Sequence, residues 1–318
     1  MQTKLLTIML VAPVVFSSQE ASASDFFGPE KISTEINLGT LSGKTKERVY
    51  EPEEGGRKVS QLDWKYSNAA ILKGAVNWEL NPWLSVGAAG WSTLNSRGGG
   101  GGDMVDQDWM DSGTPGTWTD ESRHPDTRLN YANEFDLNVK GWFLKESDYR
   151  LAIMAGYQES RYSFNATGGT YIYSENGGFR NETGALPDKI KVIGYKQHFK
   201  IPYVGLTGNY RYDNFEFGGA FKYSGWVRGS DNDEHYVRQT TFRSKVKNQN
   251  YYSVAVNAGY YITPEAKVYI EGVWSRLTNK KGDTSLYDRS DNTSEHNNNG
   301  AGIENYNFIT TAGLKYTF

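Results

Sequence analysis

The chain of 318 residues contains no cysteine, so it has neither a disulfide framework nor a cysteine nucleophile. It has no excess of positive charge either, because 34 Lys and Arg residues stand against 37 Asp and Glu residues. Without a basic footprint we expect no nucleic acid among its partners. After the N-terminal segment, no apolar run is long enough to cross a bilayer as a helix, and the mean hydropathy is -0.65.

The N-terminus has the layout of a secretory signal. Lys4 precedes an apolar run at 5–16, and a polar stretch then ends in the small residues ASA at Ala23. This order predicts a signal peptide at 1–23 and a mature domain at 24–318. A membrane anchor is disfavoured, because a spanning helix needs about 20 apolar residues. An exported chain without disulfides must be stabilised in another way, and a closed hydrogen-bonded sheet would do so.

Aromatic residues and glycine are abundant, with 22 Tyr, 9 Trp and 35 Gly. Residues 127–143 alternate between apolar and polar side chains. A period of two over this length predicts a strand with one apolar face, and the charges on its other face must meet water. The apolar positions are Leu129, Tyr131, Phe135, Leu137, Val139 and Phe143, and the polar ones are Asn130, Glu134, Asp136, Asn138 and Lys140.

The alternation recurs along the chain in segments long enough to cross a membrane, for which strands of about 9 to 11 residues suffice. Several segments are longer, and we expect the extra length to extend above the bilayer. Because barrels of this kind close with an even number of strands, we predict an all-β, antiparallel transmembrane β-barrel of about ten strands. The candidate segments are 33–42, 60–67, 69–79, 83–93, 127–143, 149–164, 196–212, 214–229, 249–263, 266–277 and 305–318.

The connections between these segments are of two kinds. Short turns alternate with long polar loops, which is typical of outer-membrane barrels with short periplasmic turns and long extracellular loops. The alternative, a soluble β-sandwich, would have to bury the charges of the polar faces. The short turns lie at 81–83, 145–148 and 263–266, and the long loops lie at 94–126, 165–195, 230–248 and 278–304.

The stretch SDNDEHY places three acids and one of the four histidines at the end of a predicted strand. Because side chains alternate in an extended chain, Asp231, Asp233 and His235 point to one side. The Cα atoms of Asp233 and His235 are then about 6.6 Å apart, near enough for the carboxylate to orient the imidazole. A second pair with this spacing, Asp106 and Asp108, lies in MVDQDWM.

Two such pairs on one rim predict a site that activates water. His235 as base and a facing carboxylate would prime a water toward a peptide carbonyl without a nucleophilic side chain. The chain has no G-x-S-x-G motif, which disfavours a covalent mechanism. Solvated loop acids remain an alternative for either pair. A metal site of His124, Asp126 and His235 lacks a repeated ligand pattern, and we expect no metal.

The two pairs lie within longer stretches, LGTLSGKTKERVYEPEEGGRKVSQLDWKY, MVDQDWMDSGTPGTWTDESRHPDTRLNYANEFDLN, GYQESRYSF, SDNDEHY and GIENYNFITTAGLKYTF. Together these stretches resemble the omptin family of outer-membrane endoproteases, over essentially the whole chain after the signal. The resemblance implies a β-barrel in the outer membrane of a Gram-negative bacterium, with its active site facing outside. It also implies cleavage between two basic residues and a requirement for lipopolysaccharide as lipid activator, with no cofactor.

The resemblance assigns roles to six acidic and basic positions. Glu47 and Asp231 match the acids that receive the basic side chain before the cut. Two carboxylates replace the hydration that such a side chain loses, whereas a neutral residue would leave them unpaired. Without the family match, Glu47 is an ordinary strand-end charge. The matches to the family's Asp-His pair are Asp233 and His235, and those to its facing pair are Asp106 and Asp108.

A lipopolysaccharide site is expected on the outer wall. Tyr157, Glu159 and Arg161 share one parity on a predicted strand, and Lys247 follows a basic cluster. Cations near the rim of a membrane-facing surface suit the phosphates of a lipid headgroup. The chain has His198 where the family usually has a further arginine, which implies altered lipid binding.

The glycine run Gly98 to Gly102 looks longer than that of the family. Extra glycines give a loop more conformational freedom. Since the run ends shortly before Asp106, its added freedom bears on the placement of that carboxylate, and the sequence leaves open whether activity is impaired.

The sequence therefore predicts an outer-membrane endopeptidase that cuts basic peptides and proteins between paired Lys or Arg residues, using water activated by Asp and His. The alternative is a non-enzymatic barrel, an adhesin or a channel whose acids line a cation-attracting mouth.

Overall fold

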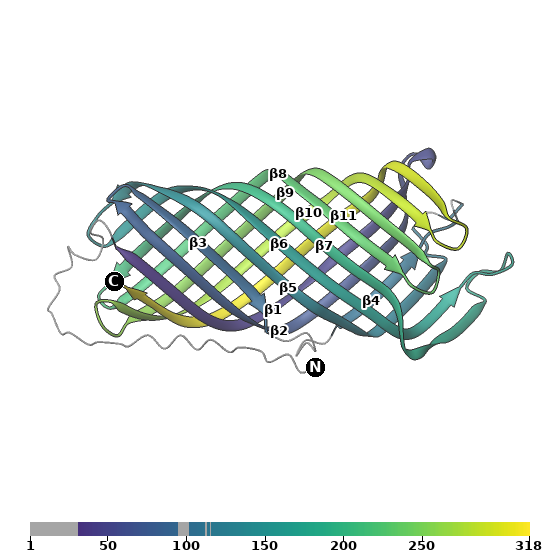
Figure 1. Cartoon of the computed structure of the whole chain (residues 1–318), viewed down its shortest axis with the longest axis horizontal. Coiled ribbons are helices and arrows are strands. Elements are labelled where there is room, and N and C mark those ends of the chain that lie inside the picture. Colours follow the sequence, from purple (N-terminus) through teal and green to yellow (C-terminus); the bar gives the residue numbers. More distant parts are fainter. Residues whose placement is uncertain (1–30, 95–101, 112, 115) are drawn as a thin grey trace, which may run out of the picture.

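The computed structural model describes residues 31–94, 102–111, 113–114 and 116–318. The predicted signal peptide at 1–23 lies outside these residues. The described chain forms one antiparallel sheet that closes on itself (Figure 1). Its strands are β1 (Ile32–Glu51), β2 (Arg57–Asn81), β3 (Leu84–Thr93), β4 (Gly102–Asp108), β5 (Asp120–Lys145), β6 (Tyr149–Tyr173), β7 (Glu182–Tyr212), β8 (Phe215–His235), β9 (Thr240–Tyr261), β10 (Ala266–Asp288) and β11 (Thr293–Thr317), with a 3-10 turn η2 (Pro52–Glu54) after β1.

The sheet has eleven strands but ten positions around the ring, because β3 and β4 share one. Both pair with β2 on one side and with β5 on the other, β3 at one end of the barrel and β4 at the opposite end. Pairing of β1 with β11 and with β2 closes the ring. The predicted barrel of about ten strands is confirmed.

The prediction of two strands at 60–67 and 69–79 is wrong, since both belong to β2. A β-bulge interrupts the alternation between them. The register of β1 against β2 shifts between Leu41 and Gly43, and Asn68 takes a positive φ of 56°. Its backbone N–H donates to the Ser42 hydroxyl at 2.9 Å, so the chain continues as one strand.

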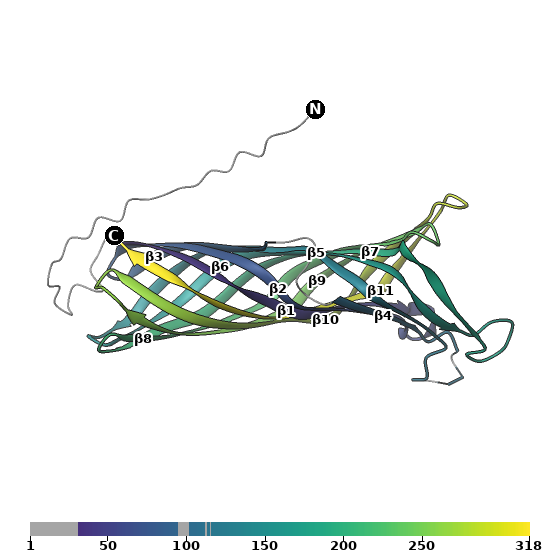
Figure 2. The ribbon, with the colours of Figure 1, turned by 90° about the horizontal axis from the view of Figure 1, so that it is seen from below.

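Most residues predicted to lie in the long loops at 165–195, 230–248 and 278–304 are strand residues instead. The hairpins β6–β7, β8–β9 and β10–β11 continue the sheet far beyond the apolar part, as Figures 1 and 2 show at the end opposite the C-terminus. The outer face of these extensions meets water, and many of the buried side chains on their inner face are polar, such as Asp231, Asp233, His235 and Ser244. Hydrophobic alternation therefore disappears there, although the backbone pairing continues.

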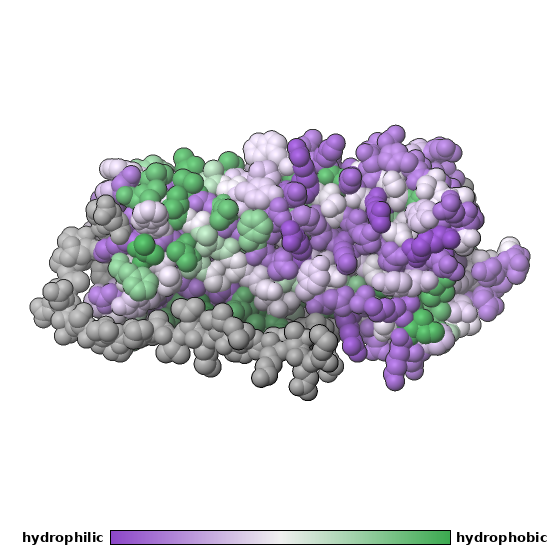
Figure 3. All heavy atoms as spheres, in the orientation of Figure 1, coloured by the Kyte–Doolittle hydropathy of each residue, from purple (hydrophilic) through white to green (hydrophobic). Residues whose placement is uncertain are grey.

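Figure 3 shows apolar side chains, here called the apolar belt, gathered on the half of the barrel that carries the C-terminus, while the other half of this face is mostly hydrophilic. The belt consists of outward-facing aliphatic and aromatic side chains, as expected for a lipid-facing wall. No helix in the described part of the chain is long and apolar enough to span a bilayer. Exposed members of the belt include Leu38, Leu137, Ile153, Leu206, Phe217, Val256, Ile270 and Leu314.

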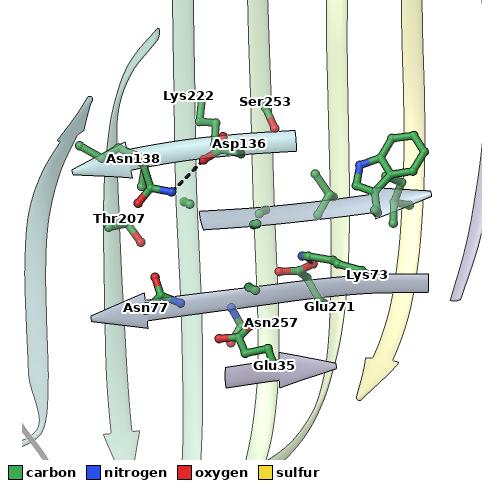
Figure 4. Close-up of a pocket in the computed structure, with 18 of the residues that line it drawn as sticks. Glu35, Lys73, Asn77, Asp136, Asn138, Thr207, Lys222, Ser253, Asn257 and Glu271 are labelled. Carbon is green, nitrogen blue, oxygen red and sulfur yellow. Dashed lines mark hydrogen bonds and ion pairs between the residues drawn. The ribbon is translucent and has the colours of Figure 1, made fainter. Parts of the chain in front are cut away.

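The barrel interior opposite the belt is polar and encloses a cavity of about 250 Å³. Figure 4 shows its charged residues pointing inward from different strands. Lys222 on β8 pairs with Asp136 on β5 at 2.6 Å, and Lys73 on β2 pairs with Glu271 on β10. Such pairs satisfy charges that burial would otherwise penalise.

A layer of buried aromatic rings crosses the barrel above this cavity. Trp64 on β2 stacks on Tyr195 of β7 with 5.3 Å between ring centroids, and Phe164 of β6 packs against Trp64 at 5.6 Å. Tyr195 also donates a hydrogen bond to Asp231, 3.2 Å away. The layer therefore forms a rigid floor beneath the acidic residues at the hydrophilic end.

Candidate active site

The end of β8 carries three of the predicted site residues on the inner wall. Asp231, Asp233 and His235 are all buried, as their alternate positions require. Nε2 of His235 lies 2.6 Å from Oδ2 of Asp233. Trp226, earlier on the same strand, is the last exposed large hydrophobic residue of β8. The three residues therefore lie outside the membrane.

The second aspartate pair lies on β4, which is hydrogen-bonded on both sides. Asp106 is opposite Leu62 of β2 and Ser122 of β5, and both it and Asp108 are buried. The effect of the glycine run on this pair concerns residues mostly outside the described ranges, but β4 begins at Gly102 and holds Asp106 in regular pairing. Asp106 and His235 line one pocket of about 360 Å³, so the two pairs face each other.

Glu47, from β1, completes the acidic cluster. Its side chain is only 2% exposed, and Asp106, Asp231 and Asp233 are its electrostatic neighbours. Burial, followed by repulsion from Asp233, Asp231 and Asp106, raises the pKa of Glu47 well above its ordinary value. Within the described structure nothing donates a hydrogen bond to Glu47 Oε2, Asp106 Oδ1 or Asp233 Oδ1. Buried acceptors without donors mark a site prepared for a ligand that brings positive charge or protons.

The pKa values of Asp106, Asp231 and His235 in this cluster are raised as well. Burial, with repulsion from Asp108, raises the pKa of Asp106 to about 8. Burial also raises the pKa of Asp231 to about 7, although Ser244 donates its backbone N–H at 2.9 Å. For His235, burial favours the neutral form, but attraction to Asp233 outweighs it and the pKa is raised. A cationic side chain that enters the site would compensate the charge of the buried carboxylates and favour their ionised form.

His124, considered above as a metal ligand, is fully buried and occupied by the protein. Its Nε2 lies 2.9 Å from the Ser122 hydroxyl, and its Nδ1 lies 2.5 Å from the Gly168 carbonyl oxygen. Asp126 is exposed. Within the described ranges no group of three His, Asp or Glu side chains has an arrangement that could hold a metal ion.

The predicted lipid-binding residues lie on the outer wall of β6 and β9. The Tyr157 hydroxyl donates to Glu159 at 2.6 Å, and Arg161 donates to it at 3.1 Å. His198 of β7 also contacts Glu159, with its Nε2 at 3.0 Å from the carboxylate. Lys247 is two strands further along the wall.

Two exposed cations that sequence reasoning missed connect Lys247 to this cluster. Lys200 is opposite Glu159 across the β6–β7 ladder, Arg228 is opposite Lys200, and Lys247 is opposite Arg228. The pairing register, which the sequence did not reveal, thus turns separate residues into one row across four strands.

Arg238 is the other residue that sequence reasoning missed. It follows His235 in the turn at 236–239, and it lines the same pocket as Asp106 and His235. No motif marks it, because its place depends on how β4 and β8 meet across the barrel.

Comparison with known proteins gives one family over this whole fold. A family model described as the Omptin family matches residues 28–318. The chain is 98% identical to the outer membrane protease OmpP of Escherichia coli strain K12 and 69% identical to Protease 7 of that strain, with 100% of each chain covered in both cases. The crystal structure of the outer membrane protease OmpT from Escherichia coli matches with a TM-score of 0.88 and 72% identity, covering 91% of this chain and 97% of that one.

Proposed function

The chain belongs to the omptin family of outer-membrane proteases, and on this premise we propose that it is an endopeptidase that cuts between two basic residues with a water activated by His235 and Asp106. That the protein is an outer-membrane protease follows from the family. We propose in addition that it selects basic residues, that Asp and His side chains activate the water, and that lipopolysaccharide is required. The observation that carries the proposal is the buried cluster of acids whose oxygens lack hydrogen-bond donors.

Recognition begins with the basic side chain before the scissile bond. It enters between Glu47 and Asp231, whose carboxyl groups have raised pKa values because they are buried close to other acids. The incoming cation favours their ionised form and supplies the missing donors. A neutral side chain would leave the same acids buried without compensation, so charge sets the selectivity.

Hydrolysis then uses the facing pairs. Asp233 accepts a hydrogen bond from Nε2 of His235, which leaves Nδ1 free to take a proton from water. The water oxygen forms a bond to the peptide carbonyl carbon, and Asp106 orients the water from the opposite wall. His235 then passes its proton to the amide nitrogen, the carbon–nitrogen bond breaks, and a carboxylate and an amine leave. Asp233 stabilises the imidazolium between the two steps.

Lipopolysaccharide is proposed to bind the outer row that includes Arg161, Lys200, Arg228 and Lys247. Positive groups just above the apolar belt match lipid phosphates in height and charge. Asp231 and His235 lie on β8, and β9 pairs with β8. A lipid bound to the outer wall of these two strands would therefore hold the inner face of the site in place.

The proposal is tested with the purified barrel, refolded with lipopolysaccharide, on matched peptides containing Arg-Arg or Ala-Ala. Cleavage between the two arginines, loss of that cleavage in His235→Ala, and retention in Arg289→Gln are expected. Arg289 is the matched surface control, since it pairs with Glu234 on the outer wall. Equal cleavage of both peptides, or undiminished cleavage by His235→Ala, contradicts the proposal. A barrel that cuts neither peptide would favour the alternative, an adhesin or a channel whose acids line a cation-attracting mouth.

A further inference from the structure

A pocket of about 360 Å³ opens on one side of the catalytic groups. Asp106 and His235 form its inner wall, while neither Glu47 nor Asp231 is among the described residues that line it. The acids proposed to hold the residue before the cut therefore lie outside this pocket. If the substrate is bound as proposed above, the residue after the cut must enter this pocket.

The pocket combines an apolar wall with acids. Leu186 and Ile193 from β7 and Tyr173 from β6 line it. The exposed acids Glu175 and Glu182 line it as well. Such a lining suits a long side chain with an apolar stem and a positive end, as in lysine or arginine.

One cation of the protein already occupies this environment. Arg238, in the turn that connects β8 to β9, is the single Lys or Arg among the described residues lining the pocket. Its guanidinium interacts electrostatically with Asp106, Asp108 and Tyr173. It also acts on His235 with like charge when the imidazole is protonated. The side chain is exposed and lies on a turn, so it can move aside without disturbing the strands.

We propose that Arg238 is a specificity-determining residue for the position after the scissile bond: its guanidinium stands in for a substrate cation in this pocket and must be displaced when that residue is basic. The inference rests on the proposed function. A basic residue after the cut gains the pocket's acids but meets the charge of Arg238, whereas a small neutral residue leaves Arg238 in place. The acids of the pocket alone would favour a basic residue after the cut, and Arg238 therefore weakens that preference.

The experiment compares two peptides that differ only after the cut, one with Arg-Arg and one with Arg-Ala, in the lipopolysaccharide-supplied full barrel. Removing the charge in Arg238→Gln is expected to raise the ratio of kcat/KM for Arg-Arg over Arg-Ala about tenfold, the factor that corresponds to about 1.4 kcal/mol. The gain should appear mainly as a lower KM for Arg-Arg. Arg238→Lys should keep the parent ratio, and Arg238→Met provides a second neutral variant.

Arg289→Gln is the matched control, because it removes one arginine from the neighbouring β10–β11 turn without touching the pocket. Heat-modifiable gel mobility reports whether each variant is folded. An unchanged ratio in folded Arg238→Gln or Arg238→Met overturns the proposal, as does an equal change in Arg289→Gln. If Arg238 only supports the turn, the variants will lower the unfolding temperature and leave the ratio unchanged. Failure of the parent protein to cut either peptide would count instead against the proposed function.

Discussion

Nε2 of His235 lies 2.6 Å from Oδ2 of Asp233, and the two residues occupy alternate positions of one strand. The contact is set by the pleat of β8 rather than by a mobile loop. Ladders with β7 and β9 on both sides hold that strand in place. The orientation of the imidazole is therefore built into the barrel wall before any substrate arrives.

Asp233→Asn is expected to move the acidic limb of the pH profile of kcat/KM to lower pH. His235 must be neutral to accept a proton, and Asp233 favours its charged form, which raises the pKa of His235. Without that carboxylate, burial lowers the pKa and the neutral imidazole persists at lower pH. The maximal rate should nevertheless fall by about 10²-fold or more, because the imidazole loses its orienting partner. The profile is measured from pH 4 to 9 on an Arg-Arg peptide.

Glu234→Gln is the control for this prediction. Glu234 is the neighbouring acid, but it faces outward and pairs with Arg289. Glu234→Gln should therefore leave the acidic limb of the pH profile unchanged. An acidic limb that stays unmoved in Asp233→Asn would show that the pair does not govern the active imidazole.

Glu47→Gln and Asp231→Asn are each expected to weaken selection for a basic residue before the cut. Each substitution removes a buried charge that faces the entering cation, and a hydrogen bond to a charged group is typically worth about 10- to 100-fold in affinity. KM for the Arg-Arg peptide should rise by that factor, while slow cleavage of neutral peptides should not decrease. Steady-state kinetics on both peptides measure the effect, with Glu53→Gln in the exposed turn η2 as control. An equal loss of kcat/KM on the Arg-Arg and the neutral peptide would mean that these acids do not select for a positive charge.

Asp106→Asn is expected to make the folded barrel more stable at pH 8 than the parent and equally stable near pH 4. The pKa of Asp106 is about 8 in the folded protein and 3.8 ordinarily, so the folded state keeps a proton that the unfolded chain has released. The parent therefore loses stability as the pH rises between about 4 and about 8. Removing the ionisable group removes that loss and should raise the unfolding temperature at pH 8 by roughly 2 to 4 °C for each kcal/mol.

The midpoint of heat-modifiable mobility at the two pH values checks this prediction. Asp111→Asn is a suitable control, because Asp111 is exposed and its pKa is lowered by the Gly113 N–H, 2.7 Å away. Its removal should not increase stability at pH 8. A parent barrel whose stability is the same at pH 4 and pH 8 would contradict the assignment of a buried, protonated Asp106.

Sequence reasoning succeeded where water and lipid impose opposite demands on one strand. Residues 131–143 alternate because their odd positions face outward and their even positions face the polar interior, and the structure places Leu137 outside and Asp136 inside. The prediction that Leu129 shares the outward face is wrong, since a register shift between Leu129 and Tyr131 turns it into the buried core. Beyond the membrane the outer face meets water and much of the inner face is polar, so the hydrophobic alternation is lost, and the continuing hairpin at 165–195 was predicted to be a loop.

Some residues of the site could likewise be predicted from a local sequence pattern, and others could not. Asp231, Asp233 and His235 share a face through the period of two, which is local and therefore visible in the sequence. That β4 lies opposite the end of β8 depends on closure of the whole ring, which no local pattern encodes. Arg238 became a candidate only once this closure had placed its turn beside Asp106.

The outer basic row of Arg161, Lys200, Arg228 and Lys247 is expected to set how activity depends on lipopolysaccharide. Arg161→Gln and Lys247→Gln should each raise the concentration of lipopolysaccharide needed for half-maximal activity, because each removes one cation from a row that would contact lipid phosphates. Since His198 holds Glu159 at 3.0 Å in this row, His198→Arg should lower that concentration by adding a permanent charge with bidentate geometry.

Titration of activity with purified lipopolysaccharide measures all three variants, and Arg276→Gln serves as the control because Arg276 lies elsewhere on the outer wall, paired with Glu304. Activity at saturating lipid should be the same in all of them, since none faces the inner site. Unshifted titrations in both Arg161→Gln and Lys247→Gln would place the lipid on another part of the barrel. A shift caused by Arg276→Gln of equal size would reduce the effect to overall surface charge rather than to this row.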